Sequence, residues 1–372
     1  MENDTEFVTT AEFMFPSHAN KLELYRILLL LEQFARPSLW FQFYLSFFGI
    51  LLTIFHLYIL TRKAMMISSI IAIMIGIAIC DVVAMLAAIL TVNIYFDEEG
   101  TDCTPPVSLF NFQFSWAFIT IRDFVRRAST WLAVAMALIR YVIIKFGATM
   151  KFDKCSKPRF GFLVIFWCFL FSAFFSLVYY FRYDFVLKKD PWQPKDHCTD
   201  VDHSLKLDAF TQKLAYIFTV YGGILGKIYQ LVNGILSKIL PCILLPILTI
   251  LLILELRKAE KNRKNSNTNA KKLTSEKTTG LVIFMTISFF LLELPIGIGL
   301  VFQVAYTDFG YLYFATYVNH LVNSICIINA LTHGAVMFSM SSQYRITVGA
   351  MLKVKASDRV FIVSHSSTSN RV

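Results

Sequence analysis

Long apolar runs separated by short polar segments fill most of the chain. A helix needs about 20 mostly apolar residues to cross the hydrocarbon layer of a membrane. Seven runs qualify: Ser38–Leu60, Met66–Tyr95, Gln113–Ile144, Phe160–Phe181, Leu231–Leu256, Leu281–Val304 and Leu312–Met340. The start of the fifth is the least defined, because Leu214–Leu225 is also apolar while Lys227 and Lys238 interrupt the pattern. The pattern predicts an all-α membrane protein, a bundle of seven transmembrane helices over residues 38–340.

Composition supports a membrane protein. Of the 372 residues, 56% are hydrophobic and only 16% are charged, and the charges cluster between the apolar runs. A soluble domain carries about 25% charged residues. The net charge of +10 is explained by basic loops facing a membrane surface, so we expect a lipid bilayer and no nucleic acid as a partner.

Lysine and arginine near the span ends predict the orientation. The loops after spans one, three and five and the tail after span seven are basic, whereas "DEEGTDCTPPVSLF" and "YTDFGY" contain neither residue. We therefore expect residues 1–37 to form an extracellular N-terminus and residues 341–372 a cytoplasmic tail. The first residues are acidic and do not resemble a cleavable signal peptide. Asn3 begins an Asn-Asp-Thr glycosylation sequon, which needs only an external N-terminus.

Of the seven cysteines, Cys103 and Cys198 lie in loops assigned to the outside, and the others lie in spans or in a cytosolic loop. An oxidising exterior favours a disulfide between them. The alternative is two unpaired loop thiols.

The third span carries unusual charge. On a helix, Arg122 and Arg140 share one face, with Arg126 and Ser129 close to the same line. Charged groups within a span face the bundle interior or a wet cavity, so we expect this span at the centre of the bundle, lining a cavity open to the outside. For Arg122 the alternative is that its side chain reaches the lipid headgroups. Asp123 and Arg127, four residues apart, are expected to pair.

Glu293 is the single charge in span six and stands two residues before Pro295, whose ring interrupts the helix and creates a hinge. We expect Arg126 and Glu293 to form a buried ion pair that holds span three against this hinge. Span two contains one charge, Asp81. With Ser129, Asn329 and His333 it is expected to form a polar cluster at mid-membrane that binds sodium. The alternative is a neutral Asp81 hydrogen-bonded to Ser129 or Asn329.

Five stretches resemble rhodopsin-like G-protein-coupled receptors, in particular the nematode serpentine chemoreceptor class W group, which is similar to FMRFamide-type peptide receptors. They are "LTRKAMMISSIIAIMIGIAICD", "RRASTWLAVAMALIRY", "ILPCILLPILTILLILELRKAEK", "LLELP" and "MSSQYR". The resemblance implies that Arg140, followed by Tyr141, engages the G protein, that Asp81 is the sodium-site aspartate, that Pro295 is the hinge of span six, and that Cys198 is the cysteine of the second external loop.

Several positions depart from that family pattern. Ile139 stands where an acidic residue usually restrains the arginine, a role that Glu276 can take at the foot of span six. Glu293 replaces the usual tryptophan of span six. The Asn-Pro-x-x-Tyr of span seven is replaced by "HGAVM", His333 to Met337. These changes alter the positions on which the usual switching mechanism of that family depends.

Beyond span seven, Tyr344, Val348, Met351 and Leu352 form an apolar side opposite basic residues, which predicts a short amphipathic helix. The whole pattern predicts a plasma-membrane receptor, not an enzyme, that senses a neuropeptide or a chemical cue and activates a heterotrimeric G protein. We expect the ligand site at Trp116, Arg122, Asp123, Arg126 and Glu293, where an anionic or carbonyl-rich ligand, or a peptide, suits the cationic mouth better than an amine. The alternatives are an odorant-gated ion channel of inverted topology and a receptor with weak or no G-protein coupling.

Overall fold

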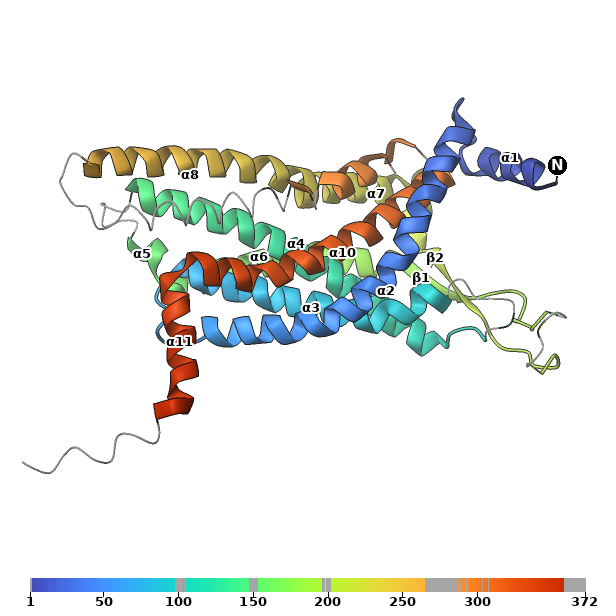
Figure 1. Cartoon of the computed structure of the whole chain (residues 1–372). Coiled ribbons are helices and arrows are strands. Elements are labelled where there is room, and N and C mark those ends of the chain that lie inside the picture. The colour runs from blue at the N-terminus through green and yellow to red at the C-terminus, as the bar shows by residue number, and fades with distance from the viewer. Residues whose placement is uncertain are drawn as a thin grey trace, which may run out of the picture.

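The computed structural model describes residues 2–97, 103, 105–146, 153–195, 198, 202–264, 287, 290–291, 294–302, 304–306 and 308–357. Long helices run side by side and form a bundle (Figure 1). Within the described residues, six helices are long and apolar enough to cross a membrane. The predicted span Leu281–Val304 is described only in part, and its residues 294–302 are helical. The predicted all-α seven-helix architecture is confirmed.

Most helices extend the predicted spans by a few residues. The five continuous ones are α2 (Lys21–Leu60), α3 (Ser69–Asp97), α4 (Leu109–Phe146), α6 (Pro158–Tyr180) and α10 (Phe309–Met340). The largest difference is α2, which begins at Lys21 instead of Ser38 and continues through Pro37. Residues 21–36 are too polar to count as a span, but they are mostly good helix formers, so the helix extends beyond the apolar run. The short helix α1 (Glu2–Met14) precedes it.

The fifth span has an irregular start. Helix α7 (Tyr216–Gly234) is broken where Tyr221, Gly222 and Gly223 adopt φ angles of 54°, 67° and 75°. This left-handed conformation suits glycine, which has no Cβ to clash. After the break the helix continues through a π-helical turn, η2 (Ile235–Ile239), into α8 (Leu240–Lys264). The helix therefore starts before the predicted Leu231, and Lys238 lies within η2 without ending it.

Helix α4 is the centre of the bundle, as predicted. It packs against α3, α6, α8 and η2. The two-stranded antiparallel sheet of β1 (Tyr183–Leu187) and β2 (Phe210–Leu214) lies at one end of the bundle, here called the hairpin end. The helices α5 (Asp153–Ser156) and α11 (Ser342–Ser357) lie at the opposite end, here called the α11 end (Figure 1).

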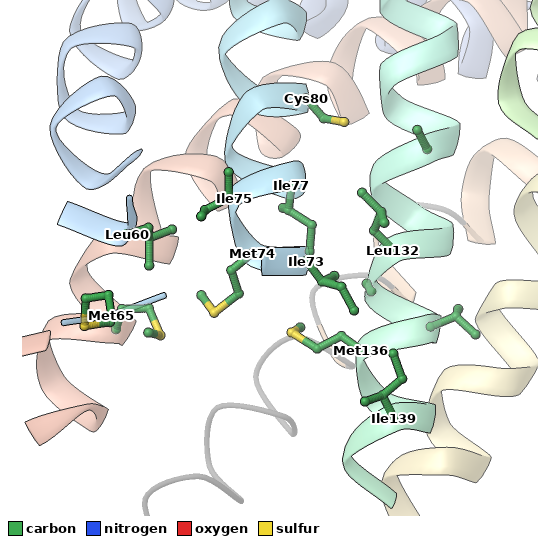
Figure 2. Close-up of a cluster of buried hydrophobic side chains, with 14 of the residues drawn as sticks. Leu60, Met65, Ile73, Met74, Ile75, Ile77, Cys80, Leu132, Met136 and Ile139 are labelled. Carbon is green, nitrogen blue, oxygen red and sulfur yellow. The ribbon is translucent and has the colours of Figure 1, made fainter. Parts of the chain in front are cut away.

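An apolar core fills the α11 half of the bundle. Figure 2 shows side chains of α3, among them Ile73 and Ile77, directed toward Leu132 and Met136 of α4. The predicted amphipathic helix docks on this core: Tyr344 of α11 is 3% exposed and belongs to the cluster, and Val348 and Met351 pack against it. Burial raises the pKa of the Tyr344 hydroxyl to about 12.

The N-terminal segment is bound to the start of α10. Phe15 is buried and meets Tyr311 edge-on, with ring centroids 5.6 Å apart. A Cβ atom at Gly310 would lie 2.2 Å from the Phe15 ring, so only glycine permits this approach. Ser17 donates from its backbone nitrogen and its hydroxyl to the carboxylate of the buried Asp308, at 3.1 and 2.5 Å. These contacts fix residues 15–17, which precede α2, on the hairpin end.

Candidate functional site

A cavity of about 360 Å³, here called the large cavity, lies toward the hairpin end. Its walls come from α4, the end of α6, the β1–β2 hairpin, α7, η2, residues 295–300 and α10. Trp116, Arg122, Asp123 and Arg126 of α4, all predicted ligand-site residues, line it together. The helical periodicity that placed Arg122 and Arg126 close to one line on span three is therefore matched by the structure.

Arg122 and Arg126 face the interior of the bundle. The structure excludes the alternative in which Arg122 reaches lipid headgroups, because its side chain is 8% exposed and lines the large cavity. Arg126 donates from Nη1 to Oδ1 of Asn323 at 2.7 Å and to Oδ1 of Asn319 at 3.3 Å. Both acceptors belong to α10, so among the described residues Arg126 connects span three with span seven.

The predicted pair of Arg126 with Glu293 stays a prediction, because Glu293 lies outside the described residues. Pro295, the predicted hinge, lies in the described stretch 294–302 and lines the large cavity. A ligand in the large cavity would therefore lie against Pro295.

The predicted Asp123–Arg127 ion pair is confirmed. Arg127 is fully buried, and its other two nitrogens also donate hydrogen bonds. Nε donates to Ser237 Oγ at 2.9 Å, and Nη1 donates to the Ser172 carbonyl at 3.1 Å and to Ser176 Oγ at 2.9 Å. These partners lie on η2 and α6, so one guanidinium joins three segments next to the large cavity. A buried charge is tolerated when it is paired and hydrogen-bonded in this way.

Aromatic side chains line the hairpin side of the large cavity. Trp116 stacks on Tyr179, with centroids 5.0 Å apart, and meets Tyr183 edge-on at 5.2 Å. Its indole nitrogen donates to the Tyr180 carbonyl at 3.1 Å. The indole is thus fixed in place, with its polar atom satisfied.

A second cavity of about 70 Å³, here called the small cavity, brings together the predicted polar cluster of Asp81, Ser129, Asn329 and His333. Asp81 Oδ2 is 3.0 Å from His333 Nδ1, and His333 Nε2 is 3.4 Å from the Asn329 amide nitrogen. Among the described residues, the hydrogen-bond partner shown for Asp81 is therefore His333, and not the Ser129 or Asn329 of the alternative. Arg122, Arg126 and Asn323 line both cavities and separate them.

The predicted coupling residues lie near the other end of α4. Arg140 is half-buried, and within the described ranges its Nε has no hydrogen-bond partner. Tyr141 accepts a hydrogen bond from Lys145 at 2.6 Å. Glu276, expected to restrain Arg140, lies outside the described residues. Arg140 and Arg126 are separated by fourteen residues of one helix, which corresponds to about 21 Å.

The predicted disulfide is confirmed: Cys103 bonds Cys198, with the Cα atoms 5.4 Å apart. It joins the segment before α4 to the loop between β1 and β2. Asn3, the predicted glycosylation site, lies within α1.

Sequence reasoning missed several residues of the site. Asn319 and Asn323 are spaced by four on α10, a polar stripe that could have been recognised in span seven. Lys238 looked like an interruption of span five, yet it is 3% exposed and lines the large cavity. Arg182 follows α6 and reaches the cavity only because the hairpin folds back, which no local pattern indicates.

Comparison with known proteins agrees with this architecture. Residues 40–355 match the family model described as serpentine type 7TM GPCR chemoreceptor Srw. The chain is also similar to the "G-protein coupled receptor dmsr-1" of Caenorhabditis elegans, with 24% identity over 269 residues, covering 70% of this chain and 50% of that relative. The chain thus spans about half the length of the curated relative it matches. Because the family model covers most of the chain, this multi-span membrane protein belongs to the serpentine type 7TM GPCR chemoreceptor Srw family, a family of receptors and not of enzymes.

Proposed function

We propose that this protein is a plasma-membrane receptor that binds an extracellular ligand, a neuropeptide or an environmental chemical cue, in the large cavity and activates a heterotrimeric G protein at the α11 end. In this proposal the hairpin end and the N-terminus face the outside. The basic loops near α5 and after α8, the disulfide at the hairpin end and the family membership support that orientation.

One observation carries the proposal: a single central helix, α4, holds the cavity-lining Arg122 and Arg126 toward one end and Arg140 toward the other. A ligand that contacts Arg126 and the Pro295 hinge together would change how α4 packs against the helix of residues 294–302. Such a displacement would open or close the surface beside Arg140, which is the step a receptor needs to signal across a membrane.

A ligand screen with a G-protein-activation readout tests this function in cells that express the receptor. Arg140→Ala is expected to abolish the ligand response with unchanged surface expression, and Arg159→Ala, an exposed arginine at the start of α6, is the matched control. Antibody access to an N-terminal tag on intact cells tests the orientation. An inaccessible tag, or a full response from Arg140→Ala, would reject the proposal, and binding without G-protein activation would favour the weakly coupled receptor.

We further propose that the small cavity binds a sodium ion. The donors present suit one: the Asp81 carboxylate, the Ser129 hydroxyl and the Asn329 Oδ1, a buried oxygen without a hydrogen-bond partner in the described part of the chain. Sodium prefers such oxygen ligands. Replacing choline with sodium as the cation of the buffer should raise the thermal stability of the purified receptor. The Asp81→Asn variant should have the same thermal stability in both salts. Equal stability in both salts would refute the site.

A further inference from the structure

Three side chains form the wall between the two cavities, here called the polar wall: Arg122, Arg126 and Asn323. Arg126 donates to Oδ1 of Asn323 at 2.7 Å, which orients the Asn323 amide. The Asn323 amide nitrogen is buried and has no hydrogen-bond partner in the described part of the structure, and the side chain is 7% exposed. A buried donor without a partner is costly, so the wall favours a ligand atom that accepts hydrogen bonds.

The charged side chains of the large cavity also favour a ligand that accepts hydrogen bonds. Its described lining contains four cationic side chains, Arg122, Arg126, Arg182 and Lys238, and one carboxylate, Asp123. Asp123 is already engaged by the fully buried Arg127. In a site of low dielectric, cationic side chains favour an anion over an amine. A planar guanidinium next to an amide donor matches a carboxylate.

The wall of the large cavity opposite the polar wall is aromatic. Phe112, Trp116, Tyr179 and Tyr183 line the hairpin side of the large cavity. Trp116 precedes Arg122 by six residues of α4, about 9 Å along the helix axis. The cavity volume of about 360 Å³ lies within the usual range for small-ligand sites, about 300–1,000 Å³. A ligand that joins an aromatic ring to a carboxylate would bridge the two walls.

We propose that the large cavity binds an aromatic carboxylate, with the carboxylate on the polar wall and the ring against Trp116 and Tyr179. This inference rests on the proposed receptor function only for the location of the ligand. The aromatic carboxylate can be a small aromatic acid, or the end of a peptide whose last residue is aromatic and has a free carboxylate. Because the anion carries the interaction, the corresponding amide binds about 10- to 100-fold more weakly.

Binding is measured by thermal unfolding of the purified full-length receptor as each probe is titrated. The small-molecule probes are indole-3-propionate, its amide and plain propionate. The peptide probes are a tetrapeptide ending in tryptophan, as the free acid and as the amide. We expect stabilisation by indole-3-propionate at millimolar concentration, and at least a tenfold higher concentration of the amide or of propionate for the same shift. The tetrapeptide acid identifies a peptide source if it acts at lower concentration than indole-3-propionate.

Three substitutions test the polar wall. Arg126→Gln is expected to weaken binding of the acid about 10- to 100-fold and to leave binding of the amide nearly unchanged. Asn323→Asp keeps the size of the side chain and adds a negative charge, so it should reject the acid even if Arg126→Gln fails to fold. Arg159→Gln removes an arginine far from the cavity and should bind like the wild type.

Equal shifts by acid and amide, no shift by either aromatic acid, or wild-type binding by both Arg126→Gln and Asn323→Asp would overturn the proposal. The assay contains no G protein. Acid-selective binding in a receptor that never activates a G protein would therefore support this inference and reject the proposed signalling. Signalling driven by amides alone would reject this inference and support the proposed signalling.

Discussion

Arg127 offers the sharpest test of how this bundle tolerates charge. Its guanidinium is fully buried, pairs with Asp123, and donates to Ser237, Ser176 and the Ser172 carbonyl. The substitution Arg127→Met preserves much of the apolar stem but leaves the carboxylate without its cation. Removal of one partner of a buried ion pair costs about 3–5 kcal/mol. Because the Asp123 side chain is 26% exposed to the cavity, water can hydrate it, and we expect a cost near the lower limit, about 3 kcal/mol.

The double variant Arg127→Met with Asp123→Asn distinguishes the cost of the unpaired Asp123 carboxylate from the cost of the lost packing. With both charges removed, a buried ion pair can be replaced at little net cost, so we expect the double variant to regain about half of the lost stability. Asp123→Asn alone leaves a fully buried cation without its anion and should be at least as destabilising as Arg127→Met.

Thermal unfolding of the detergent-purified receptor measures these effects. With the entropy of unfolding scaled per residue, a loss of about 3 kcal/mol lowers Tm by roughly 4 °C in a chain of this length. Arg159→Met, at an exposed arginine on α6, is the matched control and should unfold like the wild type. The reasoning is refuted if Arg127→Met unfolds within about 1 °C of the wild type, or if the double variant is no more stable than Arg127→Met.

Three further predictions concern other parts of the fold. Cys103→Ser opens a disulfide that closes a loop of 95 residues and should cost about 2–5 kcal/mol, seen as a lower Tm, whereas Cys155→Ser, in α5, should leave Tm unchanged. Gly310→Ala places a Cβ against the buried Phe15 ring, whereas a Cβ at Gly349 meets nothing within 4 Å, so Gly349→Ala is the control. Gly310→Ala should lower the stability of this contact by about 1–3 kcal/mol and speed limited proteolysis between α1 and α2, and Gly349→Ala should not. Because burial raises the pKa of Tyr344 to about 12, its contribution to stability is complete below pH 10 and is lost as the pH rises toward 12. A phenolate absorbance titration should show no difference between wild type and Tyr344→Phe below pH 11, and ionisation of this tyrosine near pH 10 would contradict its burial.

Much of the fold follows from local features of the sequence. A segment of about 20 apolar residues in a bilayer must satisfy its backbone hydrogen bonds internally, and a helix does so from its own residues. For the same reason, charge on span three had to face the interior, which placed α4 at the centre and Arg122 and Arg126 together on one side. The Asp123–Arg127 contact is also local, because residues four apart on a helix are neighbours. The Cys103–Cys198 disulfide was predictable because only two cysteines lie in loops assigned to the outside.

Contacts between helices depend on tertiary packing, because span positions do not specify which faces meet or at what depth. The sequence grouped Asp81 with Ser129, Asn329 and His333 but did not specify which of them bonds its carboxylate, and the packing of α3 against α10 brings the ring of His333 to it. Likewise, the partners of Arg126 on α10 and the serines around Arg127 come from segments more than forty residues away. Helical periodicity gives the direction of a side chain about its own axis, whereas the identity of its neighbour depends on how two helices are rotated and shifted relative to each other. That arrangement is fixed by the close packing of the whole bundle.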